Sequence, residues 1–553
     1  MHVHVIAVRP PAPPAGHPRP PLLGRAGRQL ALLFPEESHR TRRAPVPAIV
    51  LAYLAAIAAG ALVLLLRQAG RPPWDTLWAE DGTTFLPTAL RDPWGSILQQ
   101  YAGYLQLVPR LIADCVASLP LRAAAVGFAV AGALSASCCA VFTFRACAGH
   151  VRTTALRAVL AASVVLLPTA LIEVANSGID VPWYLIYALF WALLWRPRSG
   201  AGMAVAALIG MAAMSSQILA ALYAPLAAAR VIALPRAREQ SVTFGLLAGG
   251  ALQLPGLLLS RAPHHLSHPE RAFSFYLQHV ILTAVAGLHL AEVLQDRAGA
   301  EGAVVIAACA VALVAGWAFI RGGPRVRAFI VTAMGFGLLL TLFPAMVRSR
   351  VTIPGHVSPL WVPGERYTTA PILLIYAVVV VAADASLRRA AARPRAARPQ
   401  LARPRPARPR LARPRAARPR PARLAAWVLL LALGAVWASD IRYVDSRSSY
   451  PSWPQALSSA KSRCLGRPQA TILVPQIRAF LPCAAVAPGG SGAARRTLSF
   501  SMSPLAGSSQ AVEARFDGQI PASHRTAARL RTGRNTAPSA GRHVPDAVYL
   551  HNA

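Results

Sequence analysis

The chain has 553 residues, of which 55% are hydrophobic and 14% are charged, and its mean hydropathy is +0.43. A soluble domain cannot bury that much apolar surface, so the composition argues against a water-soluble enzyme and indicates a membrane protein. The formal charge of +36 arises from 57 basic and 21 acidic residues, while the seven cysteines form no Cys-x-x-Cys pair and no Cys/His cluster at metal spacing. Zinc and iron–sulfur sites are therefore not indicated.

The N-terminal segment, residues 1–45, contains seven arginines and many prolines. It lacks the apolar core and the small-residue cleavage site of a secretory signal. A segment of this composition cannot bury enough apolar surface to offset the entropy of ordering the chain. We therefore expect residues 1–45 to be disordered and to lie on the cytoplasmic side.

Apolar stretches of membrane-spanning length follow. A helix needs about 20 mostly apolar residues to cross a bilayer, and about eleven stretches approach this length, with the fourth to sixth being short. They cover residues 46–66, 122–144, 155–172, 181–195, 202–214, 218–233, 242–259, 303–320, 328–346, 369–385 and 424–438. The sequence therefore predicts an all-α polytopic membrane protein, with a transmembrane bundle over residues 46–387 and a last transmembrane helix over residues 424–438.

Arginines indicate the orientation of this bundle, because short cytoplasmic loops of membrane proteins are enriched in Lys and Arg. A cytoplasmic N-terminus places every short basic loop on the cytoplasmic side. The residues concerned are Arg145, Arg152, Arg157, Arg196, Arg198, Arg230, Arg236, Arg238, Arg321, Arg325, Arg327 and the run from Arg388 to Arg423. We predict a multi-pass protein of the cell inner (plasma) membrane with an extracytoplasmic C-terminus. This orientation requires the apolar stretch 275–294 to lie at the outer surface without spanning the membrane.

Two polar segments flank the last predicted span. Residues 388–423 repeat Ala-Arg-Pro-Arg units, which predict a disordered cytoplasmic loop. This loop has no aromatic residue to stack on a base, so we expect a spacer or a contact with membrane lipids and no nucleic-acid partner. Residues 439–553 are expected to form a small, partly disordered extracytoplasmic tail, in which Cys464 and Cys483 are predicted to form a disulfide.

The first outer loop, residues 67–121, is the most informative segment. Its aromatic residues are Trp74, Trp78, Phe85, Trp94, Tyr101 and Tyr104. Tryptophan and tyrosine favour the membrane–water interface, so we expect interfacial helices here, one ending near Leu90 and one over residues 105–118. An adjacent acidic pair, Glu80 and Asp81, precedes the first of these helices and is followed by Gly82.

An acidic pair in the first extracytoplasmic loop, followed by juxtamembrane helices, resembles the GT-C superfamily of membrane glycosyltransferases. The resemblance covers residues 46–438, and Gly364-Glu365-Arg366-Tyr367 matches an Arg-Tyr that often precedes a late helix in bacterial members. It implies a GT-C-like bundle that transfers a sugar from a polyprenyl-phosphate donor to an acceptor on the outer face. The partner would then be a polyprenyl-phosphate-linked sugar.

The residue types suit that chemistry by themselves. A carboxylate can take the proton of the acceptor hydroxyl, and a cation can stabilise the departing phosphate. Asp81 is the first choice for the base, Glu80 is its neighbour or a ligand to a divalent metal, and Arg366 is the candidate for binding the donor phosphate. Whether any metal or other cofactor is needed stays open. The alternative is that Glu80 and Asp81 only cap and solvate the following helix.

Other outer residues give weaker signals. Glu173, Asn176, Asp180, Trp183 and Tyr367 are expected to line the same cavity, although an ordinary tight loop would have a similar composition. A separate group, His264, His265 and His268, could bind a metal, but a solvated histidine-rich loop is the favoured interpretation.

Two other classes of function are consistent with the composition. A transporter or flippase of lipid or glycan would need a polar pathway through the membrane and often has internal repeats. The predicted spans have no charged residue near their middle, and we find no repeat among them. The remaining alternative is a non-catalytic membrane protein of envelope assembly, whose tail binds a partner.

Overall fold

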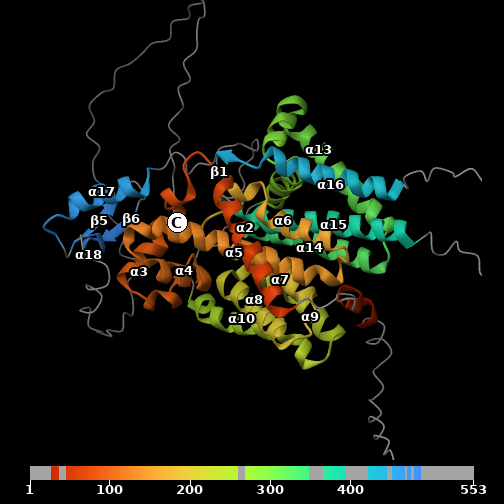
Figure 1. The fold of residues 1–553 in the computed structure, drawn as a ribbon, viewed down its shortest axis with the longest axis horizontal. Helices are drawn as coiled ribbons and strands as arrows, with labels where there is room; N and C mark the ends of the chain where they lie inside the picture. Colours follow the sequence, from red (N-terminus) through yellow and green to blue (C-terminus); the bar gives the residue numbers. More distant parts are fainter. Residues whose placement is uncertain are drawn as a thin grey trace, which may run out of the picture. The chain divides into compact units, whose positions relative to one another are not determined.

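The computed structural model shows a predominantly helical chain (Figure 1). It describes residues 27–36, 45–259, 268–347, 365–392, 421–444, 451–467, 470–474 and 479–486. Three segments that we predict to be disordered lie largely outside these residues, namely 1–45, the Arg/Pro-rich loop and the end of the tail. His264 and His265 also lie outside them.

Seven helices in the described part of the chain are, with their flanking turns, long and apolar enough to cross a membrane. They are α2 (Val46–Arg67), α5 (Ala124–Ala146), α6 (Thr154–Val165), α10 (Ser241–Leu259), α13 (His289–Arg321), α14 (Pro324–Val347) and α15 (Thr369–Ala392). Four apolar helices are shorter: α7 (Val181–Leu194), α8 (Gly200–Ser216), α9 (Ala224–Ala233) with its preceding turn, and α16 (Pro421–Ser439). The all-α, multi-pass class is thus confirmed, whereas eleven spans remain a prediction.

Glycines explain how α8 and α10 approach each other closely. A methyl group on Gly210 would lie 2.5 Å from the carbonyl oxygen of Val242, and one on Gly249 would lie 2.6 Å from that of Met211. Small residues of this kind let helix backbones touch where lipid provides no hydrophobic driving force between helices. Near this contact, Gln253 of α10 bonds to both backbone groups of Leu105 and so holds the first loop against the bundle.

The connections that we predict to be cytoplasmic lie together at one end of the bundle. Asp384 near the end of α15 accepts hydrogen bonds from the backbone N–H groups of Arg152 and Thr153, which precede α6. The imidazole of His150 bonds to the carbonyl oxygen of Leu33 at 3.1 Å. Three parts of the chain that we predict to be cytoplasmic thus share one end, as the arginine pattern requires. Which side of a membrane this end faces stays a prediction.

The expectation of disorder throughout residues 1–45 is wrong for residues 27–36. Phe34 is 1% exposed, and the Arg230 guanidinium lies 5.8 Å from the centre of its ring. Glu36 forms an ion pair with Arg196 at 3.0 Å. The physical reason is that Leu33 and Phe34 find an apolar site on the bundle, which offsets the entropy of ordering this short segment.

The apolar stretch 275–294 does not form one continuous helix. It contains the end of α11 (Pro269–Phe275), a π-helical segment Tyr276–Leu282, and α12 (Thr283–Ala286), which ends at Gly287 with φ of +70° before α13 begins. Its last residues, 289–294, belong to α13, which has spanning length, whereas the segments before them do not. The expectation of a surface position is wrong for its middle, because His279 and Leu282 are buried in the bundle.

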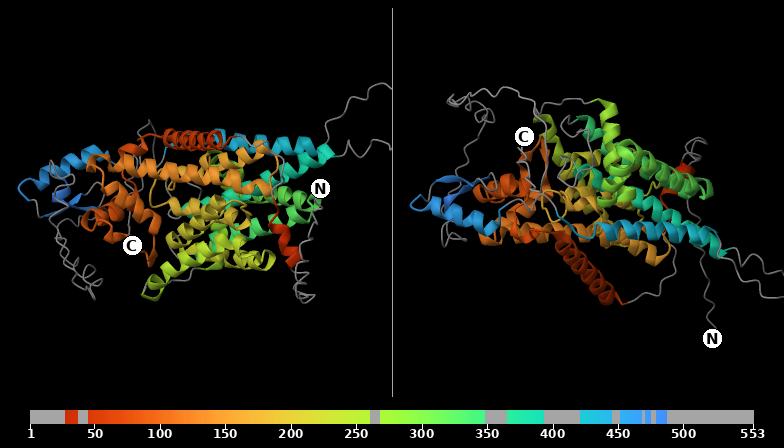
Figure 2. Two further views of the ribbon diagram at one scale, coloured as in Figure 1. Left: turned by 60° about the horizontal axis from the view of Figure 1, so that its bottom comes forward. Right: turned by 90° about the horizontal axis from the view of Figure 1, so that it is seen from above.

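The first loop and the tail form a second, smaller core (Figures 1 and 2). The loop contains α3 (Leu86–Arg91), the hairpin strands β2 (Gln100–Tyr101) and β3 (Tyr104–Leu105), and α4 (Leu107–Ala117), so two helices form where interfacial helices were expected. The tail contributes α17 (Trp453–Cys464), β5 (Thr471–Val474), β6 (Ala479–Pro482) and α18 (Cys483–Val486). Trp453 donates its indole N–H to the carbonyl oxygen of Leu121 at 2.9 Å. The folded part of the tail is therefore docked on the first loop.

A strand pair joins distant parts of the chain at this end, and a disulfide lies within the tail. Strand β1 (Gln68–Ala69), at the end of α2, pairs in parallel with β4 (Tyr443–Val444), which follows α16. Cys464 and Cys483 are bonded in the structure, and their Cα atoms lie 5.3 Å apart. The disulfide closes the α17–β5–β6 unit on itself.

Candidate functional site

An acidic cluster surrounds one arginine where the first loop meets the start of α15. The Arg366 guanidinium Nη1 lies 3.4 Å from Glu173 Oε1 and 3.7 Å from Glu80 Oε1. The backbone N–H of Arg366 also donates to Glu173 Oε2 at 2.9 Å. Asp180, which lies in the field of Arg366, completes what we call the acid–arginine cluster: Glu80, Glu173, Asp180 and Arg366. The structure therefore brings together residues that the sequence indicated only one by one as candidates.

Two residues next to the cluster have unusual backbone conformations. Ala79, directly before Glu80, has φ of 41°, and Asn176, between Glu173 and Asp180, has φ of 58°. Residues other than glycine adopt left-handed angles at a cost of roughly 1 kcal/mol or more, and such residues concentrate at functional sites. The Asn176 amide holds its turn in place by donating to the Leu64 carbonyl oxygen at 3.0 Å and to Gln68 Oε1 at 3.3 Å.

Asp81 is fully engaged by the loop that follows α6. Its carboxylate accepts hydrogen bonds from the Ser177 hydroxyl at 3.1 Å and from the backbone N–H groups of Gly178 at 2.9 Å and Ile179 at 2.8 Å. It is 1% exposed, whereas the side chain of the neighbouring Glu80 is 20% exposed. These contacts favour Asp81 as the residue that positions the two loops, and they favour Glu80 as the carboxylate that a substrate can reach.

We expect Asp81→Asn to destabilise the fold. An amide group presents an N–H₂ donor to backbone N–H donors, so at least one buried hydrogen bond is lost, at a cost of about 1 to 3 kcal/mol. Thermal unfolding of the purified variant in detergent should show a lower midpoint than wild type. The control is Asp92→Asn, a carboxylate whose side chain accepts a bond from Gln99 in an exposed part of the same loop. An unchanged midpoint for Asp81→Asn would contradict the positioning role.

Aromatic side chains enclose the cluster. Tyr101 of the β2–β3 hairpin donates its hydroxyl to Glu80 Oε1 at 3.3 Å. The rings of Trp183 and Tyr367 meet edge to face with their centres 5.0 Å apart, and the Arg366 guanidinium lies 5.9 Å from the Tyr367 ring. Trp183 and Tyr367 therefore do lie with the cluster, next to Arg366.

Burial shifts the protonation of the cluster. It raises the pKa of Glu173, although Arg366 opposes this shift. It also raises the pKa of Asp180 well above the ordinary value, and Glu173 adds to that effect through like-charge repulsion. Burial and the charge of Glu80 raise the pKa of the Tyr101 hydroxyl, which keeps it a proton donor. Three carboxylates thus share one guanidinium, and such a group can hold or release a proton.

The raised pKa of Asp180 predicts a pH-dependent cost. The folded state keeps this proton at pH values where the unfolded chain has already lost it, so stability falls as pH rises from the ordinary pKa of 3.8 towards the raised one. Asp180→Asn removes this titration. We expect the thermal midpoint of the variant to exceed that of wild type at pH 8, and the two to converge near pH 4. A difference that does not change with pH would contradict this expectation.

Two residues of the site were missed as a pair by the sequence analysis. The imidazole Nδ1 of His279 lies 2.7 Å from Glu365 Oε1, and both side chains are buried beside the acid–arginine cluster. His279 belongs to the π-helical segment Tyr276–Leu282, just as Asp81 begins the π-helical turn Asp81–Phe85. Such turns occur often at functional sites. The available signal was a histidine within an apolar stretch, but nothing in the sequence pairs it with Glu365.

Within the described ranges, no group of three or more His, Cys, Asp or Glu side chains could hold a metal ion. No family model, curated protein or solved structure matches the chain. The chemistry of the site is therefore argued from its own residues: a reachable carboxylate, a guanidinium held by a second carboxylate, and an aromatic wall.

Proposed function

We propose that this chain is an integral membrane glycosyltransferase of GT-C type. It would transfer a sugar from a polyprenyl-phosphate donor to an envelope glycan, lipid or protein acceptor on the extracytoplasmic face of the inner (plasma) membrane. The observation that carries the proposal is the pairing of Glu80 with Arg366 across two loops at one end of the bundle. In this proposal Glu80 is the base and Arg366 is the phosphate-binding cation, and their side chains form an ion pair at 3.7 Å.

The contacts suggest a division of roles. The acceptor oxygen attacks the anomeric carbon, the bond from that carbon to the phosphate oxygen breaks, and polyprenyl phosphate leaves. Glu80 takes the proton of the acceptor hydroxyl, because its side chain is partly exposed and that of Asp81 is enclosed. Arg366 binds the phosphate through charge-assisted hydrogen bonds. Glu173 acts as a positioning residue, since it holds both the guanidinium and the backbone of Arg366.

The site also suits a lipid-borne donor. Two of the three tryptophans of the first loop, Trp74 and Trp94, are exposed, and exposed apolar residues cover the neighbouring helix α2. Aromatic residues of this kind lie at the membrane–water interface. A polyprenyl chain can remain among lipids while its phosphate reaches Arg366. The cluster would then meet the acceptor from the aqueous side.

The proposal is tested by transfer of radiolabelled sugar in membranes that contain the full chain. A panel of polyprenyl-phosphate-linked sugars serves as donors, and membranes without the chain serve as the control. We expect chain-dependent release of polyprenyl phosphate together with a labelled product. If no donor in the panel is consumed, while the same membranes move a labelled lipid-linked glycan across the bilayer, the chain is a flippase and the proposal is wrong.

A further inference from the structure

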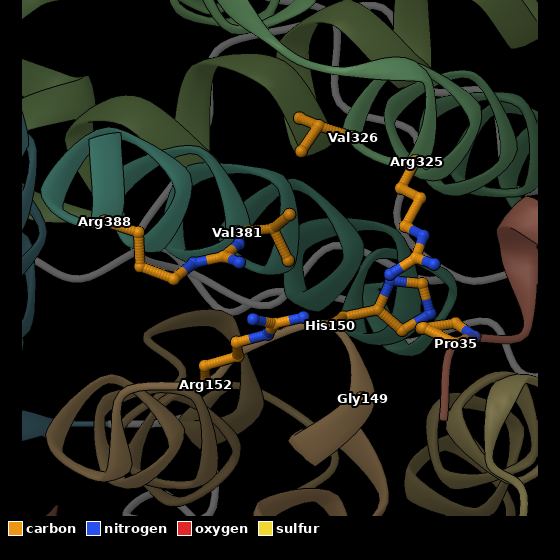
Figure 3. A pocket seen from close by; sticks show the side chains of 8 residues that line it. All are labelled: Pro35, Gly149, His150, Arg152, Arg325, Val326, Val381 and Arg388. Carbon is orange, nitrogen blue, oxygen red and sulfur yellow. The ribbon is translucent and has the colours of Figure 1, made fainter. Parts of the chain in front are cut away.

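A second polar site lies at the other end of the bundle. α15 begins at Thr369, three residues after Arg366, and reaches Asp384 after a rise of about 22 Å for an α-helix. Near its end is a cavity of about 40 Å³, lined by Pro35, Gly149, His150, Arg152, Arg325, Val326, Val381 and Arg388 (Figure 3). This inner cavity contains no residue of the acid–arginine cluster, so the proposed transfer reaction does not use it.

Three arginines from different parts of the chain converge on the inner cavity. Arg152 comes from the α5–α6 loop, Arg325 from the start of α14 and Arg388 from the end of α15. Figure 3 shows the three guanidinium groups pointing inward towards His150. These long side chains could all extend into solvent. Their convergence brings like charges together, which is unfavourable unless an anion lies between them.

Charge compensation at this site is incomplete within the described part of the chain. Asp384 is 0% exposed and pairs with Arg388 at 2.8 Å. Its remaining hydrogen bonds come from the backbone of Arg152 and from Thr153. Among the described residues no carboxylate lies within ion-pair distance of the Arg152 or Arg325 guanidinium. Two positive charges therefore face the cavity without a carboxylate partner among the residues that the structure describes.

The residues that line the cavity favour a small, charged ligand. Val326 and Val381 provide apolar surface beside the guanidinium groups. His150 is neutral at pH 7, because burial lowers its pKa to about 4, so the positive charge comes from the arginines. A volume of about 40 Å³ holds a few water-sized groups, which suits a single oxyanion rather than a nucleotide or a sugar.

We propose that the inner cavity binds a phosphate group, through the guanidinium groups of Arg152 and Arg325. Planar guanidinium groups bind phosphate oxygens in pairs, which a single ammonium cannot do. Two sources share this chemistry: the headgroup of an anionic phospholipid, and free phosphate. The orientation predicted from the arginine pattern would place the cavity at the cytoplasmic leaflet, where anionic lipids attract basic residues.

The test uses the purified full chain and two probes. Native mass spectrometry in detergent measures the binding of phosphatidylglycerol against phosphatidylcholine, and thermal unfolding without lipid measures stabilisation by inorganic phosphate. We expect Arg325→Gln and Arg152→Gln each to weaken binding of the effective probe by about tenfold. Arg321→Gln is the matched control, because Arg321 is exposed near the same turn and does not line the cavity. Arg152 and Arg325 are both exposed residues, so these substitutions should not prevent folding.

The two probes separate the sources of the phosphate. Preferential retention of phosphatidylglycerol that both cavity variants lose supports a lipid headgroup. Stabilisation by inorganic phosphate that both variants lose supports free phosphate. If wild type, Arg325→Gln, Arg152→Gln and Arg321→Gln bind each probe equally, or if wild type binds neither, the inner cavity is not a phosphate site.

Discussion

Replacing Glu80 by Gln should reduce sugar transfer by at least about 10²-fold while leaving the fold intact. The side chain keeps its size, and its carbonyl oxygen can still accept the Tyr101 hydroxyl. The substitution removes the proton acceptor and the negative charge that pairs with Arg366. The measurement is the single-turnover rate with labelled donor, at equal amounts of folded protein. Glu270→Gln is the matched control, since that glutamate is 82% exposed in α11 and should leave the rate unchanged.

The comparison with Asp81→Asn decides which carboxylate is the base. If Asp81 only positions the loops, the folded fraction of that variant should transfer sugar within about tenfold of wild type despite its lower stability. The sequence-based assignment of Asp81 as the base predicts the reverse order. A folded Asp81→Asn protein that is inactive, beside an active Glu80→Gln protein, would return the role to Asp81.

Removing the guanidinium of Arg366 should have the largest effect on stability. Arg366→Ala leaves Glu80, Glu173 and Asp180 without their shared cation, and leaving one member of a buried ion pair alone costs about 3 to 5 kcal/mol. Transfer should fall as well, with a higher donor requirement, because the phosphate loses its cation. Unfolding midpoints and the dependence of rate on donor concentration measure the two effects separately.

A double-mutant cycle tests why the stability falls. Glu173→Gln removes one buried charge, so Arg366→Ala combined with Glu173→Gln should be more stable than Arg366→Ala alone. Transfer should remain low in the double variant, because the cation is still absent. If the two stability losses simply add, Glu173 does not hold Arg366 energetically, and its role as a positioning residue is wrong.

The position of each apolar helix follows from local sequence. A run of apolar residues without charge must satisfy its backbone within one helix, whatever surrounds it. The eleven predicted stretches therefore fall on helices, from α2 to α16. The seven that reach spanning length do so through composition alone, whereas the short helices α7, α8 and α9 are buried by their neighbours to different extents. Whether these short helices cross a membrane depends on how they pack against other helices. A short stretch of sequence carries no information about that packing.

The sequence by itself also determined which basic loops lie at the same end of the bundle. Arginine-rich loops separated by pairs of helices had to share one end, and the loops with His150, Arg325 and Arg388 do so around the inner cavity. The ordered structure of residues 27–36 could not be predicted in this way, because the apolar site that binds Phe34 is formed by helices far along the chain. A basic, proline-rich context gave no local sign of that site.

Only the tertiary structure decided which acidic residue meets which partner. Glu80 and Asp81 are adjacent and chemically alike, so sequence cannot rank them. Backbone N–H groups of the loop after α6 enclose Asp81, while Glu80 turns towards Tyr101 and Arg366. Arg366 and Glu173 are 193 residues apart, and their contact depends on how α6, α7 and α15 pack. Side-chain burial and partners arise from long-range packing, and these set the reach and the protonation of each carboxylate.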